Sequence, residues 1–128
     1  MSDKKYVVVP QGGAKPLAPY SPGIVSGDFL YTSGQIGLDP DTQKLVQGVE
    51  AQAKQALENL GAVLEAAGVK FSDLIKVTIF MTDMQDYAAI NAIYGEYFDD
   101  EPPARSAVQV GALPAGALVE IEAVAALK

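Results

Sequence analysis

Residues 49 to 81 read VEAQAKQALENLGAVLEAAGVKFSDLIKVTIFM, and this stretch decides the fold. From Val49 to Ala67 apolar side chains recur at steps of three and four residues while charged side chains take the other faces, which predicts an amphipathic helix. Gly68 is a natural C-terminal cap, because glycine readily adopts the left-handed conformation in which many helices end. Leu74 to Met81 is rich in Ile, Val, Thr and Phe, and therefore predicts a strand after the helix.

Strand patterns precede this unit. A β-branched and aromatic run over residues 6–9 ends at Pro10 and predicts a short strand. Two further runs, 24–25 and 29–36, flank Ser26-Gly27-Asp28, a turn signal that predicts a hairpin. Asp39-Pro40-Asp41 predicts the turn that closes this part of the chain.

A second helix and two more strands follow the unit. The helix is predicted over residues 84–98, with Thr82 or Asp83 as its cap. Its apolar and aromatic residues share one face: Tyr87, Ile90, Tyr94, Tyr97 and Phe98. Strands are predicted over 104–110 and 118–127. The order of elements favours an α+β fold, with one domain over residues 1–128 and two helices on one face of a mixed sheet.

The last predicted strand is apolar on both of its faces. Val119, Ile121, Ala123 and Ala125 share one face, and Leu118, Val124 and Ala126 accompany Glu120 and Glu122 on the other. Two helices cover only one face of a sheet, so we expect neighbouring copies of the chain to bury the second face. The pattern predicts an oligomer without fixing the number of copies.

Composition narrows the chemistry. The 128 residues contain no cysteine and no histidine, so thiolate nucleophiles and the commonest transition-metal ligand are absent. Proton transfer falls to a carboxylate, a tyrosine, a lysine or a water. A net charge of -7 disfavours nonspecific binding to nucleic acid. The apolar run near the start is too short for a signal peptide or a membrane span, so a cytoplasmic protein without a membrane partner is expected.

Arg105 is the first candidate for chemistry. It follows Pro102-Pro103-Ala104 at the start of a predicted strand, on the same face as Ala107 and Gln109. This rigid approach and the small neighbour suit a guanidinium that takes a carboxylate in two parallel hydrogen bonds. Spacing alone favours the plainer interpretation, a surface arginine paired with an acidic residue.

Glu120 and Glu122 lie two residues apart and therefore on one strand face. Among aliphatic neighbours at least one carboxyl should be partly buried, which would raise its pKa toward the range of a general base. The plainer alternative is that both point to solvent.

Three further segments carry weaker signals. Ser33-Gly34-Gln35 places a hydroxyl beside a glycine that permits close approach of a small molecule, although such triplets more often mark a bulge or strand end. Tyr20 lies in a proline-flanked loop that would hold its phenol in place, or use it for packing. Asn91 interrupts the apolar pattern of the second helix, and a satisfied amide on a half-buried face is the preferred interpretation.

These segments together resemble a known family. Five of them match in order and spacing: Pro19-Tyr20-Ser21, Thr32-Ser33-Gly34-Gln35-Ile36, Asn91-Ala92-Ile93-Tyr94, Pro103-Ala104-Arg105-Ser106 and Glu120-Ile121-Glu122-Ala123. The chain resembles the reactive intermediate/imine deaminase family, also called the YjgF/YER057c/UK114 family, over nearly its whole length. The resemblance favours the functional interpretation of each candidate over the plainer one.

The resemblance implies a chorismate-mutase-like α+β fold and a homotrimer with a site between subunits. It implies that Arg105 binds the carboxylate of a 2-imino acid and that Glu120 positions the hydrolytic water. It also implies a substrate-binding lining of Tyr20, Ser33, Gly34, Asn91 and the backbone of Ala107. The products would be a 2-oxo acid and ammonia, formed without a metal or organic cofactor from imines that pyridoxal-phosphate dehydratases release.

Departures from the family pattern leave alternatives open. Ala107 stands where many members have cysteine, and Pro22-Gly23 replaces a different pair after Pro-Tyr-Ser. A non-catalytic, carboxylate-binding or chaperone-like protein is the main alternative to an enzyme. An endoribonuclease is a third interpretation, which the acidic charge and the missing histidine disfavour.

Overall fold

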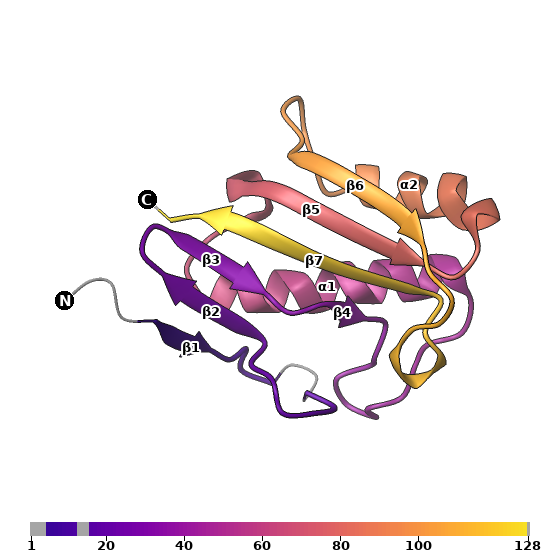
Figure 1. Cartoon of the computed structure of the whole chain (residues 1–128), viewed down its shortest axis with the longest axis horizontal. Coiled ribbons are helices and arrows are strands. Elements are labelled where there is room, and N and C mark those ends of the chain that lie inside the picture. Colours follow the sequence, from indigo (N-terminus) through magenta and orange to yellow (C-terminus); the bar gives the residue numbers. More distant parts are fainter. Residues whose placement is uncertain (1–4, 13–15, 128) are drawn as a thin grey trace.

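A computed structural model of the chain describes residues 5–12 and 16–127. One mixed sheet and two α-helices, α1 and α2, dominate it, as Figure 1 shows. The strands are β1 (Tyr6–Val8), β2 (Gly23–Ser26), β3 (Phe29–Thr32), β4 (Gln35–Ile36), β5 (Leu74–Met81), β6 (Ala104–Gln109) and β7 (Val119–Ala126). The α-helices are α1 (Val49–Ala66) and α2 (Tyr87–Gly95), and three short 3₁₀ turns cover Phe71–Asp73, Met84–Asp86 and Pro114–Gly116.

The strands are ordered β1-β2-β3-β7-β5-β6, and β4 also pairs with β7. β5 and β6 are parallel, while the other pairs are antiparallel. The parallel pair is connected through α2, as a parallel connection requires. The prediction of a mixed sheet with two helices is confirmed.

The helices lie behind the sheet in Figure 1 and bury one of its faces. β5 contributes Val77, Ile79 and Met81 to this core, all fully buried. β7 contributes Val119, Ile121, Ala123 and Ala125, as its alternation predicts. Leu57, Leu60, Val63 and Leu64 of α1 pack against them, and each is at most 1% exposed.

The opposite face of the sheet carries apolar side chains beside polar ones, and neither helix covers it. Phe29, Tyr31 and Val108 point to this side and are 38%, 46% and 42% exposed. Between β3 and β6 lie the partly buried side chains of Phe80 and Val124. We call this surface the open face. The mixture of apolar residues with Glu120 and Glu122 on this face is as the sequence predicts, and its burial against other copies stays a prediction.

The predicted hairpin is confirmed as the antiparallel pair of β2 and β3, but its second strand is shorter than predicted. Gly27 has φ +61 in the turn between β2 and β3, a conformation that suits glycine. The predicted strand over 29–36 is wrong as one element, because β3 ends at Thr32 and β4 begins at Gln35. Ser33 and Gly34 interrupt the ladder, and the N–H of Ser33 instead donates to the carbonyl of Pro22.

The first predicted helix is confirmed, with Gly68 at φ +78 after its C-terminus. The second is regular only over Tyr87–Gly95, so its predicted length over 84–98 is wrong at both ends. The carboxylate of Asp83 accepts the N–H of Gln85 and holds Met84–Asp86 in a tighter 3₁₀ turn. Past Gly95 the chain leaves the helix, and the rings of Tyr97 and Phe98 pack against Phe71 in tilted and edge-on contacts.

Candidate functional site

A pocket of about 230 Å³ lies at the end of the sheet where β4 pairs with β7. It is lined by four residues that the sequence singles out: Tyr20, Ser33, Gly34 and Glu120. Its remaining walls are apolar: Leu17, Ala18, Ile36 and Pro114. We call this hollow the Glu120 pocket. Three segments of the chain, 17–20, 33–36 and 114–120, therefore meet in it.

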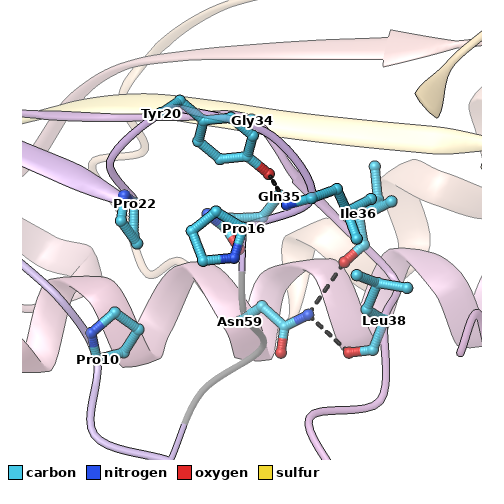
Figure 2. Close-up of a pocket in the computed structure, with 10 residues that line it drawn as sticks. Pro10, Pro16, Tyr20, Pro22, Gly34, Gln35, Ile36, Leu38 and Asn59 are labelled. Carbon is cyan, nitrogen blue, oxygen red and sulfur yellow. Dashed lines mark hydrogen bonds between the residues drawn. The ribbon is translucent and has the colours of Figure 1, made fainter. Parts of the chain in front are cut away.

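Local hydrogen bonds fix the rim of the Glu120 pocket. The hydroxyl of Ser33 donates to the carbonyl of Ser21, and the N–H of Leu17 donates to the Tyr20 hydroxyl at 3.3 Å. Figure 2 shows an adjoining hollow that shares Tyr20, Gly34 and Ile36 with the Glu120 pocket, with the Tyr20 ring beside Gly34 and the Asn59 amide reaching Ile36 and Leu38. The Tyr20 side chain is 44% exposed, so its ring can still contact a ligand.

Asn59 supports this segment from the core. Its amide donates to the carbonyls of Ile36 at 3.0 Å and Leu38 at 2.9 Å, and Asn59 itself is 6% exposed. Gln52 on the same helix accepts the N–H of Leu118, just before β7, and donates to the carbonyl of Val46. The two buried amides of α1 therefore hold β4 and the start of β7 in place. The sequence pattern does not single out either amide, because polar residues in a helical pattern are usually exposed.

Glu120 extends from β7 on the side of the open face, opposite Phe80 and Ile36 in the register. Burial raises the pKa of its carboxyl group, and the nearby charge of Glu122 raises it further. This agrees with the prediction that one of the two glutamates is partly buried. A carboxylate with a raised pKa is suited to accept a proton from water.

Arg105 lies on the other side of the sheet. Its register partner is Val77, whose side chain points into the core under the helices. Nη1 donates to Oδ1 of Asn91 at 2.8 Å, and Nη2 donates to the hydroxyl of Tyr87 at 3.0 Å. The guanidinium carbon lies 4.9 Å from the ring centre of Tyr94. The predicted plainer role is wrong, because within the described residues Arg105 pairs with no carboxylate.

The backbone of Ala107 faces the free edge of the sheet. The N–H of Val110 donates to Met81 of β5, and the direction of these groups alternates along a strand. The N–H and C=O of Ala107 therefore point away from β5. β6 is the last strand of the sheet, so a ligand or another chain can reach them.

The structure thus brings the predicted residues together in two groups instead of one. Tyr20, Ser33, Gly34 and Glu120 share a pocket, while Arg105 contacts Asn91 on the opposite side of the sheet. In one copy of the chain, Arg105 and Glu120 therefore extend from opposite faces of the sheet. Tyr87, which the sequence indicates only as a helix-face residue, is a direct partner of Arg105.

The described residues offer neither a metal site nor a membrane-spanning helix. The chain has no histidine or cysteine, and no three Asp or Glu residues of the described part lie close enough together to hold a metal ion. No helix in residues 5–12 and 16–127 is long and apolar enough to cross a membrane.

Comparison with known proteins defines the class to which this fold and these residues belong. The sequence profile of the family described as Endoribonuclease L-PSP matches residues 12–127, so the chain belongs to this family. The resemblance to the reactive intermediate/imine deaminases is thereby confirmed.

Individual relatives cover nearly the whole chain. A RutC family protein of Pyrococcus horikoshii is 48% identical over 122 residues, 94% of this chain and 97% of the relative. The 2-iminobutanoate/2-iminopropanoate deaminase of Mus musculus is 49% identical over 110 residues, 85% of this chain and 82% of the relative. Among solved structures, TdcF of E. coli with bound serine superposes with a TM-score of 0.92 at 39% identity, covering 96% of this chain and 99% of that one.

Proposed function

We propose that this protein is a hydrolase acting on C=N bonds, which converts reactive 2-imino and enamino acids to 2-oxo acids and ammonia. The substrates proposed are 2-aminoacrylate, 2-iminopropanoate and 2-iminobutanoate, which pyridoxal-phosphate-dependent dehydratases release. Residues 1–128 act as one domain of chorismate-mutase-like fold in a homotrimer, and detoxification of these metabolites is the role proposed.

One observation carries the proposal. The Glu120 pocket holds a carboxylate of raised pKa and no cation, and Arg105 on the other side of the sheet is a cation with no carboxylate partner in the described chain. Each is half of a site for a small anion that reacts with water. A neighbouring copy whose β6 edge lies beside the Glu120 pocket would bring the two halves together, and a symmetric assembly would repeat this site at every interface.

The chemistry follows from the two side chains. Two N–H groups of Arg105 bind the substrate carboxylate and orient the C=N carbon toward the Glu120 pocket. A water held by Glu120 attacks this carbon, Glu120 accepts the proton that the water loses, and the proton passes to the nitrogen. The hydroxyl of this intermediate then gives its proton to the amino nitrogen as the C–N bond breaks, so that ammonia leaves and the hydroxyl oxygen becomes the carbonyl of the 2-oxo acid.

The relatives support this assignment. The mouse protein named as a 2-iminobutanoate/2-iminopropanoate deaminase matches 85% of the chain. TdcF, similar in fold over 96% of the chain, was solved with serine, a small amino acid with the carboxylate that the proposed substrates share.

The test couples the purified protein to a threonine dehydratase and follows release of 2-oxobutanoate. The wild-type protein is expected to accelerate release, and Arg105→Ala to lower kcat/KM by at least roughly 30-fold, or about 2 kcal/mol of transition-state binding. Lys70→Ala, which removes an exposed cation elsewhere, is the control and should match the wild type.

Two outcomes would reject the enzyme assignment: no acceleration by the wild type, or equal acceleration by Arg105→Ala. Binding of 2-oxobutanoate without acceleration would favour the carboxylate-binding alternative instead.

A further inference from the structure

Three side chains of α2 surround Arg105. Tyr87, Asn91 and Tyr94 are spaced four and three residues apart and therefore share one helix face. This face lies against β6, the edge strand that carries Arg105. We call the three residues the Arg105 cage. Two hydrogen bonds hold the edge of the guanidinium, and its central carbon lies over the ring of Tyr94.

The polar partners in this cage are uncharged. An amide oxygen and a phenolic hydroxyl use two of the five N–H donors of the guanidinium, which leaves three for a ligand. Sixteen acidic residues are available in the chain, and those in the described part leave Arg105 unpaired. A carboxylate in place of the Asn91 amide would hold the guanidinium equally well, but it would neutralise the charge.

We propose that Asn91 and Tyr87 are positioning residues that fix the plane of Arg105 and keep its charge available for an anionic ligand. Asn91 then acts through Arg105 instead of touching the substrate, in contrast to the direct contact expected from the sequence. The inference deepens the proposed function, since it takes Arg105 as the group that binds the substrate carboxylate.

The cage also explains why Tyr87 stays exposed. Its side chain is 40% exposed, although a helix face against a sheet usually buries its aromatic residues. The Tyr87 hydroxyl accepts from Nη2 of Arg105 in an exposed contact, while Asn91 accepts from Nη1 in a partly buried one. Removing either acceptor frees one N–H and allows the guanidinium to rotate. Because the Asn91 contact is more buried than the Tyr87 contact, loss of the Asn91 acceptor should weaken ligand binding more.

The experiment measures binding of 2-oxobutanoate to the full-length assembled protein by calorimetry. Asn91→Asp introduces a carboxylate against Arg105 and is expected to weaken binding at least about tenfold while the melting temperature is kept or raised. Ala92→Asp adds the same charge to an exposed position of the same helix and should change binding less than about twofold.

A second pair of variants tests the hydroxyl alone. Tyr87→Phe keeps the ring and removes the acceptor, and should weaken binding about threefold with kcat retained. Tyr97→Phe makes the same change beyond the helix, where the hydroxyl donates to Glu58, and should leave binding unchanged.

The inference is overturned if Asn91→Asp binds 2-oxobutanoate as the wild type does, or if Ala92→Asp weakens binding equally. It is also overturned if the wild type does not bind this anion at all. Its failure is separable from that of the proposed function: a wild type that binds with the expected variant pattern but hydrolyses no imine supports the cage and rejects the enzyme.

Discussion

The carboxylate of Glu120 lies against the bare Cα of Gly34. A Cβ at position 34 would overlap the carboxylate oxygen and lie 2.6 Å from Cδ of Glu120. Gly34 stands between β3 and β4, where the chain interrupts its ladder beside β7. The sequence indicates that a small molecule could approach Gly34 closely, and in the structure the Glu120 carboxylate takes this place. The absence of a side chain at Gly34 therefore sets the position of that carboxylate.

Gly34→Ala should displace Glu120 without unfolding the protein. The overlapping atoms belong to the end of a flexible side chain, so Glu120 rather than the backbone moves. We expect kcat/KM in the coupled assay to fall roughly 10- to 100-fold, since a shift of about 1 Å in a reacting group has effects of this size. Gly95→Ala is the matched control, because a Cβ there meets no atom within 4 Å. A fully active Gly34→Ala protein would show that the position of Glu120 is unimportant.

Two inactive variants should restore activity when mixed. If each site takes Arg105 from one copy and Glu120 from another, a mixed assembly of Arg105→Ala and Glu120→Gln chains contains intact sites. With equal amounts and random exchange, about one site in four is intact, so about a quarter of the wild-type activity is expected. The chains are unfolded and refolded together, and the two separately refolded variants serve as controls. Activity no higher than the controls would argue that both residues act from the same copy.

The raised pKa of Glu120 predicts how the enzymatic activity decreases as the pH is lowered. Burial and the charge of Glu122 favour the protonated form, so a base at this position loses activity at higher pH than an ordinary glutamate would. The folded state also binds this proton more tightly than the unfolded chain does. Stability therefore increases as the pH falls through the raised pKa toward the ordinary value, while activity decreases.

Glu122→Gln removes the second cause and should move the acid limb of kcat/KM to lower pH. Glu65→Gln, at an exposed position of α1, should leave the limb in place. If Glu122→Gln leaves the profile unmoved, another group controls the acid limb.

Asn59→Leu should destabilise the protein. The change keeps the side-chain volume but leaves the carbonyls of Ile36 and Leu38 buried without their donor. We expect a loss of about 2 to 4 kcal/mol in the free energy of unfolding, measured by urea denaturation at fixed protein concentration. Gln47→Leu, at an exposed position, is the control and should change it by less than about 0.5 kcal/mol. Equal stability of Asn59→Leu and wild type would contradict a supporting role for this amide.

The spacing of apolar residues was sufficient to predict most of the helices and strands. The alternation in β7 and the spacing in α1 depend on which side chains must be buried, and burial is repeated along each element. Helix and strand ends were less predictable. Ser33 and Gly34 break the predicted strand because Ser33 bonds to Pro22 and Glu120 occupies the space beside Gly34, contacts between residues far apart in the chain.

What the sequence by itself determined is the α+β class, the two-sided apolar strand and the identity of Arg105 and Glu120 as candidates. These depend on residue type and local spacing, which folding does not alter. Only the tertiary structure decided that the two candidates lie on opposite sides of the sheet, because the pairing of β6 and β7 with β5 sets which way each side chain points. The same pairing places α2 beside β6, and so gives Arg105 two uncharged partners that no local pattern indicates.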